Sequence, residues 1–138
     1  MNPLPPPISE PREVSSQTRV LVVSPCQGMY GGMEAFVMAV ADSLAKRPEF
    51  SVRIVWKMVR KFQLDPVFEG IVSGAGIRSV FVPRMSGELW RQITWSDVVH
   101  CQNAPPDVIS MALVLRRPVA LTIHNWNRRS NSFGRRLF

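Results

Sequence analysis

Cysteine and long apolar runs are scarce in this 138-residue sequence. Its two cysteines are too few for a disulfide framework, and neither belongs to a C-x-x-C pair of the kind that binds zinc. No apolar run approaches the ~20 residues that a membrane-spanning helix needs. The N-terminus also lacks the basic-then-apolar pattern of a signal peptide. We therefore expect a cytoplasmic protein with no metal ion and no cofactor.

Acidic residues are also few, with 10 Asp and Glu against 17 Lys and Arg, which gives a net charge of +7. Arg128, Arg129, Arg135 and Arg136 lie in a C-terminal segment without acidic residues, so part of the excess belongs to a solvated or truncated tail. A basic balance favours nucleic acid, an anionic membrane surface or phosphorylated small molecules as partners. Because no basic motif interleaved with aromatic residues is present, we predict no nucleic-acid partner.

The sequence divides into a leader, one domain and a tail. Residues 1–17 contain five prolines, whose backbone favours polyproline conformations and cannot pair in a sheet, so we expect a disordered leader. Residues 18–126 suit one domain, since domains commonly have roughly 100–150 residues. Residues 127–138 form the basic tail, where the chain looks truncated.

Short apolar runs alternate with helical patterns through the domain. The first run, Val20-Leu21-Val22-Val23, is continuously apolar and ends at Ser24-Pro25, as expected of a strand buried on both faces. The first helix should bury Phe36, Val37, Val40, Ala41 and Leu44. The pattern predicts strands over 19–23, 51–56, 78–82, 97–101 and 118–123, and helices over 33–45, 66–73, 88–94 and 107–115. It indicates an α/β fold with a Rossmann-like open parallel sheet in the order 3-2-1-4-5 and helices on both faces.

The loop after the first strand is rich in glycine. Gly31 and Gly32 would let a ligand approach the backbone closely, and the following helix would point its N-terminal amides at an anion or a hydroxyl. A plain strand-to-helix turn also favours glycine, so both interpretations stay open. The loop matches neither a dinucleotide fingerprint nor a phosphate-binding P-loop.

The chain has only two histidines, and both fall near the predicted carboxyl ends of strands. His100 lies in the fourth predicted strand and His124 follows the fifth. Ligands bind open parallel sheets at this edge, where a histidine can bind a hydroxyl, donate to a phosphate or act as a base. A structural role for each histidine is the alternative.

Three motifs occur in order at these strand ends: G-G-M-E, S-D-V-V-H and L-T-I-H-N. Together they resemble the N-terminal domain of retaining GT-B glycosyltransferases of the family 4-like group, over about residues 19–126. The resemblance implies the N-terminal half of a GT-B fold. It implies that Gly31 and Gly32 approach the donor diphosphate and sugar and that His124 is a catalytic residue at the sugar. Cleft support would come from Glu34, His100 and Asn125.

The resemblance also implies the partners. They are a nucleotide-sugar donor, a saccharide or lipid acceptor, a C-terminal nucleotide-sugar domain or partner subunit, and peripheral contact with the inner membrane surface. The basic pair and the two glutamates of that second domain have no counterpart here, so we expect this chain alone to be inactive. A non-catalytic Rossmann-like module that binds a small molecule or a protein partner is the alternative.

Overall fold

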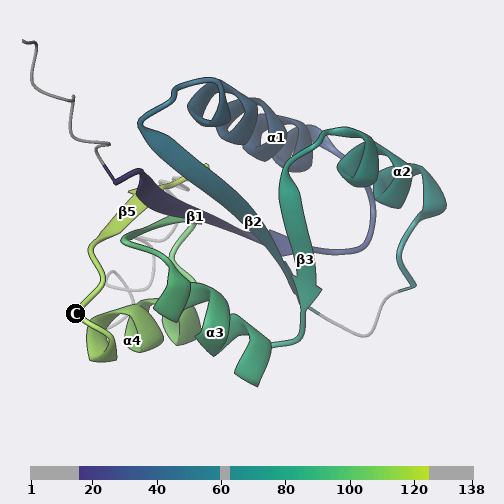
Figure 1. Ribbon diagram of the computed structural model, residues 1–138. Helices are drawn as coiled ribbons and strands as arrows, with labels where there is room; N and C mark the ends of the chain where they lie inside the picture. Colours follow the sequence, from purple (N-terminus) through teal and green to yellow (C-terminus); the bar gives the residue numbers. More distant parts are fainter. Residues whose placement is uncertain (1–15, 60–62, 125–138) are drawn as a thin grey trace, which may run out of the picture.

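The computed structural model describes residues 16–59 and 63–124 (Figure 1). Most of the predicted leader, Asn125 and the basic tail lie outside the described residues. The strands are β1 (Thr18–Cys26), β2 (Phe50–Met58), β3 (Arg78–Val82), β4 (Val98–Gln102) and β5 (Val119–Thr122). The helices are α1 (Gly32–Ala45), α2 (Pro66–Gly74), α3 (Gly87–Trp95) and α4 (Pro106–Val114).

The five strands form one parallel sheet in the order β3-β2-β1-β4-β5. This confirms the predicted α/β class and strand order. The chain first moves outward from β1 to β2 and β3, and then returns to place β4 on the other side of β1. The strand order therefore reverses beside β1, and open α/β sheets bind ligands beyond the carboxyl ends of the strands at such a point.

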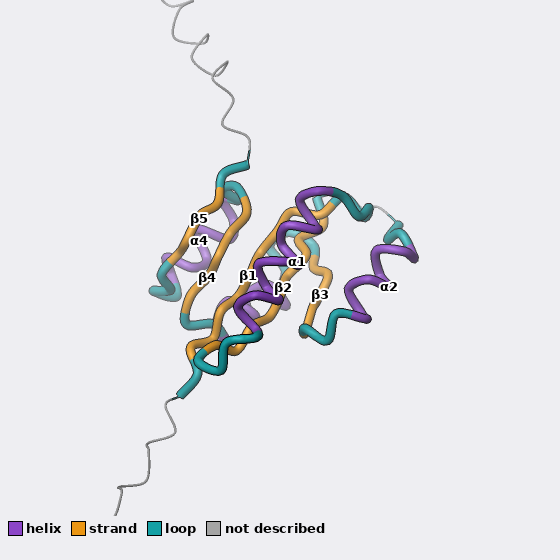
Figure 2. Tube along the Cα trace, turned by 90° about the horizontal axis from the view of Figure 1, so that it is seen from above, coloured by secondary structure: helices purple, strands orange, loops and turns teal. Residues whose placement is uncertain are grey.

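Helices cover both faces of the sheet, as predicted. Helices α1 and α2 pack on one face, whereas α3 and α4 pack on the other; Figure 1 shows the sheet between the two layers, and Figure 2 looks down on the side that carries α1 and α2. Alternate residues of β1 enter the two cores: Leu21 and Val23 lie on the α3–α4 side, and Val20 and Val22 on the α1–α2 side. A strand between two helical layers must be apolar at every position, which explains the continuous apolar run.

The first strand is longer than its sequence predicted. Pairing with β2 continues through Ser24↔Trp56 to Cys26↔Met58, past the expected stop at Ser24-Pro25. Pairing with β4 ends at Val23↔Cys101. Pro25 is therefore tolerated because β1 has a neighbour on only one side at this point, where a missing N–H leaves no ladder bond unmade.

Helix α1 buries fewer of its apolar side chains than predicted. Val37 and Ala41 are buried against the sheet, but Phe36 is 40% exposed. The Phe36 ring instead contacts His124 edge-on, with the ring centroids 4.9 Å apart. The expectation that Phe36 belongs to the core is wrong. Among the described residues, no second helix packs beside α1 over β4 and β5, so this side of α1 stays open to solvent.

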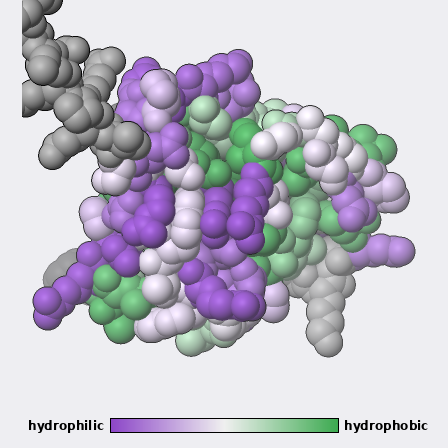
Figure 3. Space-filling view, viewed as in Figure 1, coloured by the Kyte–Doolittle hydropathy of each residue, from purple (hydrophilic) through white to green (hydrophobic). Residues whose placement is uncertain are grey.

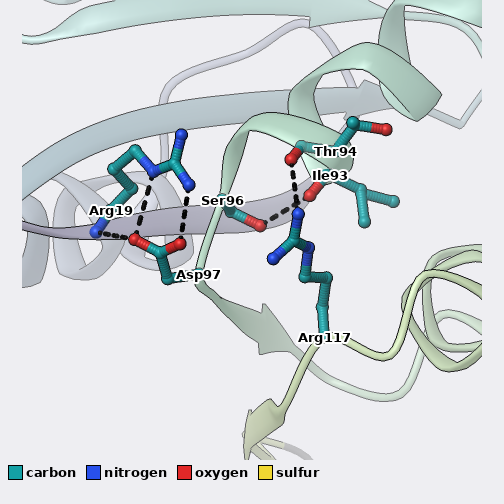
Figure 4. Close-up of polar contacts among 6 residues, drawn as sticks. All are labelled: Arg19, Ile93, Thr94, Ser96, Asp97 and Arg117. Carbon is teal, nitrogen blue, oxygen red and sulfur yellow. Dashed lines mark hydrogen bonds and ion pairs between the residues drawn. The ribbon is translucent and has the colours of Figure 1, made fainter.

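An ion pair joins the amino ends of β1 and β4 (Figure 4). The Arg19 guanidinium donates to both oxygens of the Asp97 carboxylate, at 2.7 and 3.1 Å. The Arg19 amide also donates to Asp97, and the Asp97 amide donates back to the Arg19 carbonyl at 2.8 Å. Arg117 donates to the Thr94 carbonyl nearby. These contacts fix the sheet end opposite to the carboxyl edge.

Within the described ranges, no helix is long and apolar enough to cross a membrane. The longest, α1, has 14 residues. A spanning helix needs ~20 residues, so the finding agrees with the short apolar runs of the sequence.

Candidate functional site

The glycine loop, residues 27–32, connects β1 to α1 at the carboxyl edge. Gly28 has a φ of 87°, a left-handed conformation that glycine adopts without steric cost. Its amide donates to the Cys26 sulfur at 3.2 Å, and its carbonyl accepts from the Asp65 amide at 2.8 Å. The loop is thus anchored to the segment before α2. Sequence reasoning missed Gly28, although a lone glycine directly after a strand is a known turn signal.

Gly31 and Glu34 form the N-terminal cap of α1. Gly31 is extended, with a φ of −145°, and its amide donates to Glu34 Oε2 at 3.0 Å. A methyl group placed on Gly31 would lie 3.2 Å from that oxygen. The buried carboxylate of Glu34 therefore has a structural task, the satisfaction of an amide that helix geometry leaves without a partner.

Gly32 is the open position of the loop. A methyl group placed on it would have no neighbour within 4 Å. It lines a pocket of about 450 Å³, which we call the loop pocket. The other lining residues are Pro25, Gln27, Met29, Tyr30, Gly31, Met33, Glu34 and Val59. Space is therefore present beside the start of α1 at Gly32, whereas the Gly31 amide is already bonded to Glu34.

His124 follows β5 and contacts both neighbouring elements. Its Nε2 lies 2.6 Å from Gln102 Oε1 at the end of β4, and its ring meets Phe36 on α1. Its amide donates to Asn103 Oδ1 at 3.3 Å. An amide oxygen only accepts, so this contact assigns the proton to Nε2, and Nδ1 is the acceptor of the neutral ring. The predicted catalytic histidine thus has a fixed orientation at the carboxyl edge.

His100 occupies a different environment. It is the third of five residues in β4, half-buried on the α1 side of the sheet, with Nε2 2.8 Å from Thr122 Oγ1. Burial, with a smaller effect of His124, lowers the pKa of His100 below its ordinary value. His100 therefore lies beneath His124 rather than at the edge itself.

The predicted site residues come together only in part. His124 lies against Phe36, which follows Gly32 by about one helical turn, so the histidine is close to the start of α1. The residues that line the loop pocket do not include His124. Asn125 lies outside the described residues. The loop and His124 are thus neighbouring features of one edge rather than walls of one pocket.

A second pocket at this edge was missed by sequence reasoning. It has a volume of about 800 Å³ and lies between the strand ends and α4, and we call it the α4 pocket. Lys57 of β2 and Asp107 of α4 form an ion pair in its wall, with side chains only 6% and 13% exposed. Burial by itself would raise the pKa of Asp107, but the hydrogen bond and charge of Lys57 outweigh it, and the pKa is lowered. The sequence feature that could have pointed to this ion pair is a lysine inside an otherwise apolar strand segment, Val-Trp-Lys-Met.

Comparisons of this chain with protein-family models, with curated proteins and with solved structures find no match. The function must therefore be argued from the chain's own geometry. Three features bear on function, and all lie at the carboxyl edge of one parallel sheet. They are the open glycine loop, the oriented His124 and the α4 pocket with its buried ion pair.

Proposed function

We propose that this chain is the N-terminal, acceptor-side domain of a GT-B glycosyltransferase of the family 4-like group. The enzyme would move a sugar from a nucleotide-sugar donor to a saccharide or lipid acceptor. The observation that carries the proposal is that the open Gly32 begins the helix whose Phe36 contacts His124, at the carboxyl edge beside the reversal of strand order. Open α/β sheets bind their ligands at this place.

The loop pocket suits the sugar and its phosphate. The first amides of a helix lack intrahelical partners and lie at the positive end of the helix dipole, so Gly32 and Met33 can donate to an oxygen anion. The carboxylate of Glu34 also lines this pocket. The negative charge of Glu34 disfavours a phosphate deep in the pocket. Its carboxylate oxygens can accept hydrogen bonds from sugar hydroxyls. The pocket therefore suits a sugar with its phosphate at the rim.

His124 suits the task of holding the transferred sugar. Gln102 and Phe36 fix the ring, which reduces the entropy lost when the ring binds a ligand. The neutral ring can accept a hydrogen bond from a sugar hydroxyl at Nδ1, and the protonated ring can donate a hydrogen bond to an oxygen anion. The nucleotide would contact a C-terminal domain or a partner subunit. With a lipid acceptor, the reaction would occur where the domain meets the inner surface of the membrane.

A titration of the ¹⁵N-labelled 138-residue chain tests this proposal. The probes are glucose 1-phosphate and uridine diphosphate glucose, with uridine as the comparison. Because this domain would contact the sugar and phosphate, both sugar phosphates should shift the Gly31, Gly32 and His124 signals, whereas uridine should not. Gly32→Val should weaken binding by about tenfold or more, since the added side chain occupies the approach to the helix amides.

Gly87→Val is the matched control. Gly87 is the first residue of α3, as Gly32 is of α1, and a methyl group placed on it also has no neighbour within 4 Å. Both variants should fold equally well, but only Gly32→Val should lose the sugar-phosphate shifts. The proposal is wrong if neither sugar phosphate shifts the loop signals, or if the two glycine variants bind alike.

A further inference from the structure

The helical layer on the α1–α2 side of the sheet leaves two strands uncovered. The hydrophobic core on this side contains residues of β1 and β2 and packs against β3, but it contains none of β4 or β5. Figure 2, which looks onto this side, shows β4 and β5 beside α1 rather than beneath it. Parallel sheets are normally buried on both faces, so this part of the sheet is where a further segment would pack.

The uncovered strands and α1 form an apolar groove of about 480 Å³, which we call the α1 groove. The lining residues are Phe36, Ala39, Val40, Ser43 and Leu44 of α1, His100 of β4 and Ala120 of β5. None of them is a lysine, arginine, aspartate or glutamate, and His100 is already bonded to Thr122. The side of the molecule drawn in Figure 3 differs, since hydrophilic side chains gather at its centre. The α1 groove therefore suits apolar side chains that need burial.

The segment that follows β5 starts at one end of this groove. The ring of His124 lies 4.9 Å from the ring of Phe36, which lines the groove. Trp126 is two residues further along the chain, so its Cα lies within about 7 Å of the His124 Cα. The Trp126 side chain can therefore reach the Phe36 end of the groove.

The same segment is long enough to reach the other end. Phe36 and Leu44 are separated by about 12 Å along α1, at the rise of an α-helix. Phe133 follows Trp126 by seven residues, which cover about 10 Å as a helix and about 23 Å when extended. Phe133 can thus reach the Leu44 end in either conformation. Leu137 and Phe138 add further apolar side chains, and the four arginines of the segment can remain in water.

We propose that residues 125–138 of this chain cover the α1 groove, with Trp126 against Phe36 and Val40 and with Phe133 near Leu44. A tethered segment outcompetes a separate molecule, because a short link corresponds to an effective concentration in the millimolar range. The net charge of +7 disfavours a second copy of the chain as the occupant. The contact would also hold Phe36 against His124, whichever ligand the carboxyl edge binds.

Nuclear Overhauser contacts in the 138-residue chain test the proposal. The Trp126 indole protons should contact the Val40 methyl groups, and the Phe133 ring should contact the Leu44 methyl groups. Val37, on the buried side of α1, should contact neither. Absence of both contacts in the folded chain would overturn the proposal. Contacts that appear only between differently labelled copies in a mixed sample would also overturn it, because they would show that a second copy fills the groove.

A pair of tryptophan variants provides the matched control. Trp126→Ser should remove both contacts and raise the fluorescence of the dye anilinonaphthalene sulfonate, because the groove becomes exposed. Trp90→Ser, at a position of α3 that is 40% exposed, should leave both contacts in place and should not raise the fluorescence. Both variants carry the same charge, so the dye reports apolar surface alone. Equal dye fluorescence in the two variants would contradict the proposal.

Discussion

The two histidines show how the same residue type takes different tasks within one sheet. His100 is half-buried in β4 and bonded to Thr122, and its pKa is lowered mainly by burial. His124 is exposed at the edge, where Gln102 and Phe36 orient its ring. Both are near strand ends in the sequence, so only their surroundings distinguish a structural histidine from one that can meet a ligand.

Alanine substitutions should separate these two tasks. His100→Ala should lower the free energy of unfolding by about 1–2 kcal/mol, because it removes a half-buried ring and leaves the Thr122 hydroxyl without its partner. His124→Ala should lower it less, since water can replace the ring at an exposed position, but it should weaken the binding of glucose 1-phosphate. Urea unfolding and the NMR titration measure the two effects. Equal losses of stability, with unchanged ligand binding in His124→Ala, would show that both residues are structural.

At the scale of the element, the N-terminus of α1 depends on one side chain of its own. Glu34 accepts from the Gly31 amide, so the helix start is held by a contact three residues away in sequence. The same turn carries the open Gly32, and the next turn carries Phe36, which contacts His124. The geometry of the loop pocket therefore depends on this cap.

Removal of the cap should destabilise α1. Glu34→Ala should cost about 1 kcal/mol of unfolding free energy, the usual effect of a lost N-terminal cap. Glu34→Gln retains an amide oxygen that can accept from Gly31, so it should cost less. Urea unfolding measures both, and hydrogen exchange should become faster at the Gly31 amide in the alanine variant. The same cost for both variants would mean that the charge matters and the hydrogen bond does not.

At the scale of the whole molecule, the two ends of the sheet have separate roles. The amino ends of β1 and β4 are joined by Arg19 and Asp97, whereas the carboxyl ends carry the loop pocket, the α4 pocket and His124. The hydrogen bonds from Arg19 lower the pKa of Asp97 to about 2, from an ordinary value of 3.8. The ionised carboxylate therefore stabilises the fold above about pH 3.8, and this contribution is lost as the pH falls toward 2.

Asp97→Asn should remove this acid-dependent contribution. The variant should be less stable than the unmodified chain at pH 7, and the difference should shrink between pH 4 and pH 2, the range set by the two pKa values. Asp42→Asn is the control, because Asp42 pairs with Lys46 on the exposed side of α1. Thermal unfolding between pH 2 and pH 7 measures the effect. A difference between Asp97→Asn and the unmodified chain that is constant over this range would contradict the assignment.

The sequence by itself determined the architecture and the edge at which ligands should bind. Apolar strands that alternate with amphipathic helices admit few arrangements, since parallel strands need crossovers and crossovers are right-handed. Strand order, the two helical layers and the position of Gly31 and Gly32 before α1 followed from this local pattern. The extent of β1 did not, because Pro25 is tolerated only where β4 has stopped pairing.

The tertiary structure alone decided which side chains meet. The Lys57–Asp107 pair joins residues 50 positions apart, and His124 meets Gln102 from 22 positions away. Such contacts depend on how neighbouring strands and helices are aligned, which no periodicity along the chain records. The same reason explains Phe36, whose spacing suits a core position. Phe36 packs on His124 because no helix among the described residues covers the sheet beside α1, and the end of β5 brings His124 to that place.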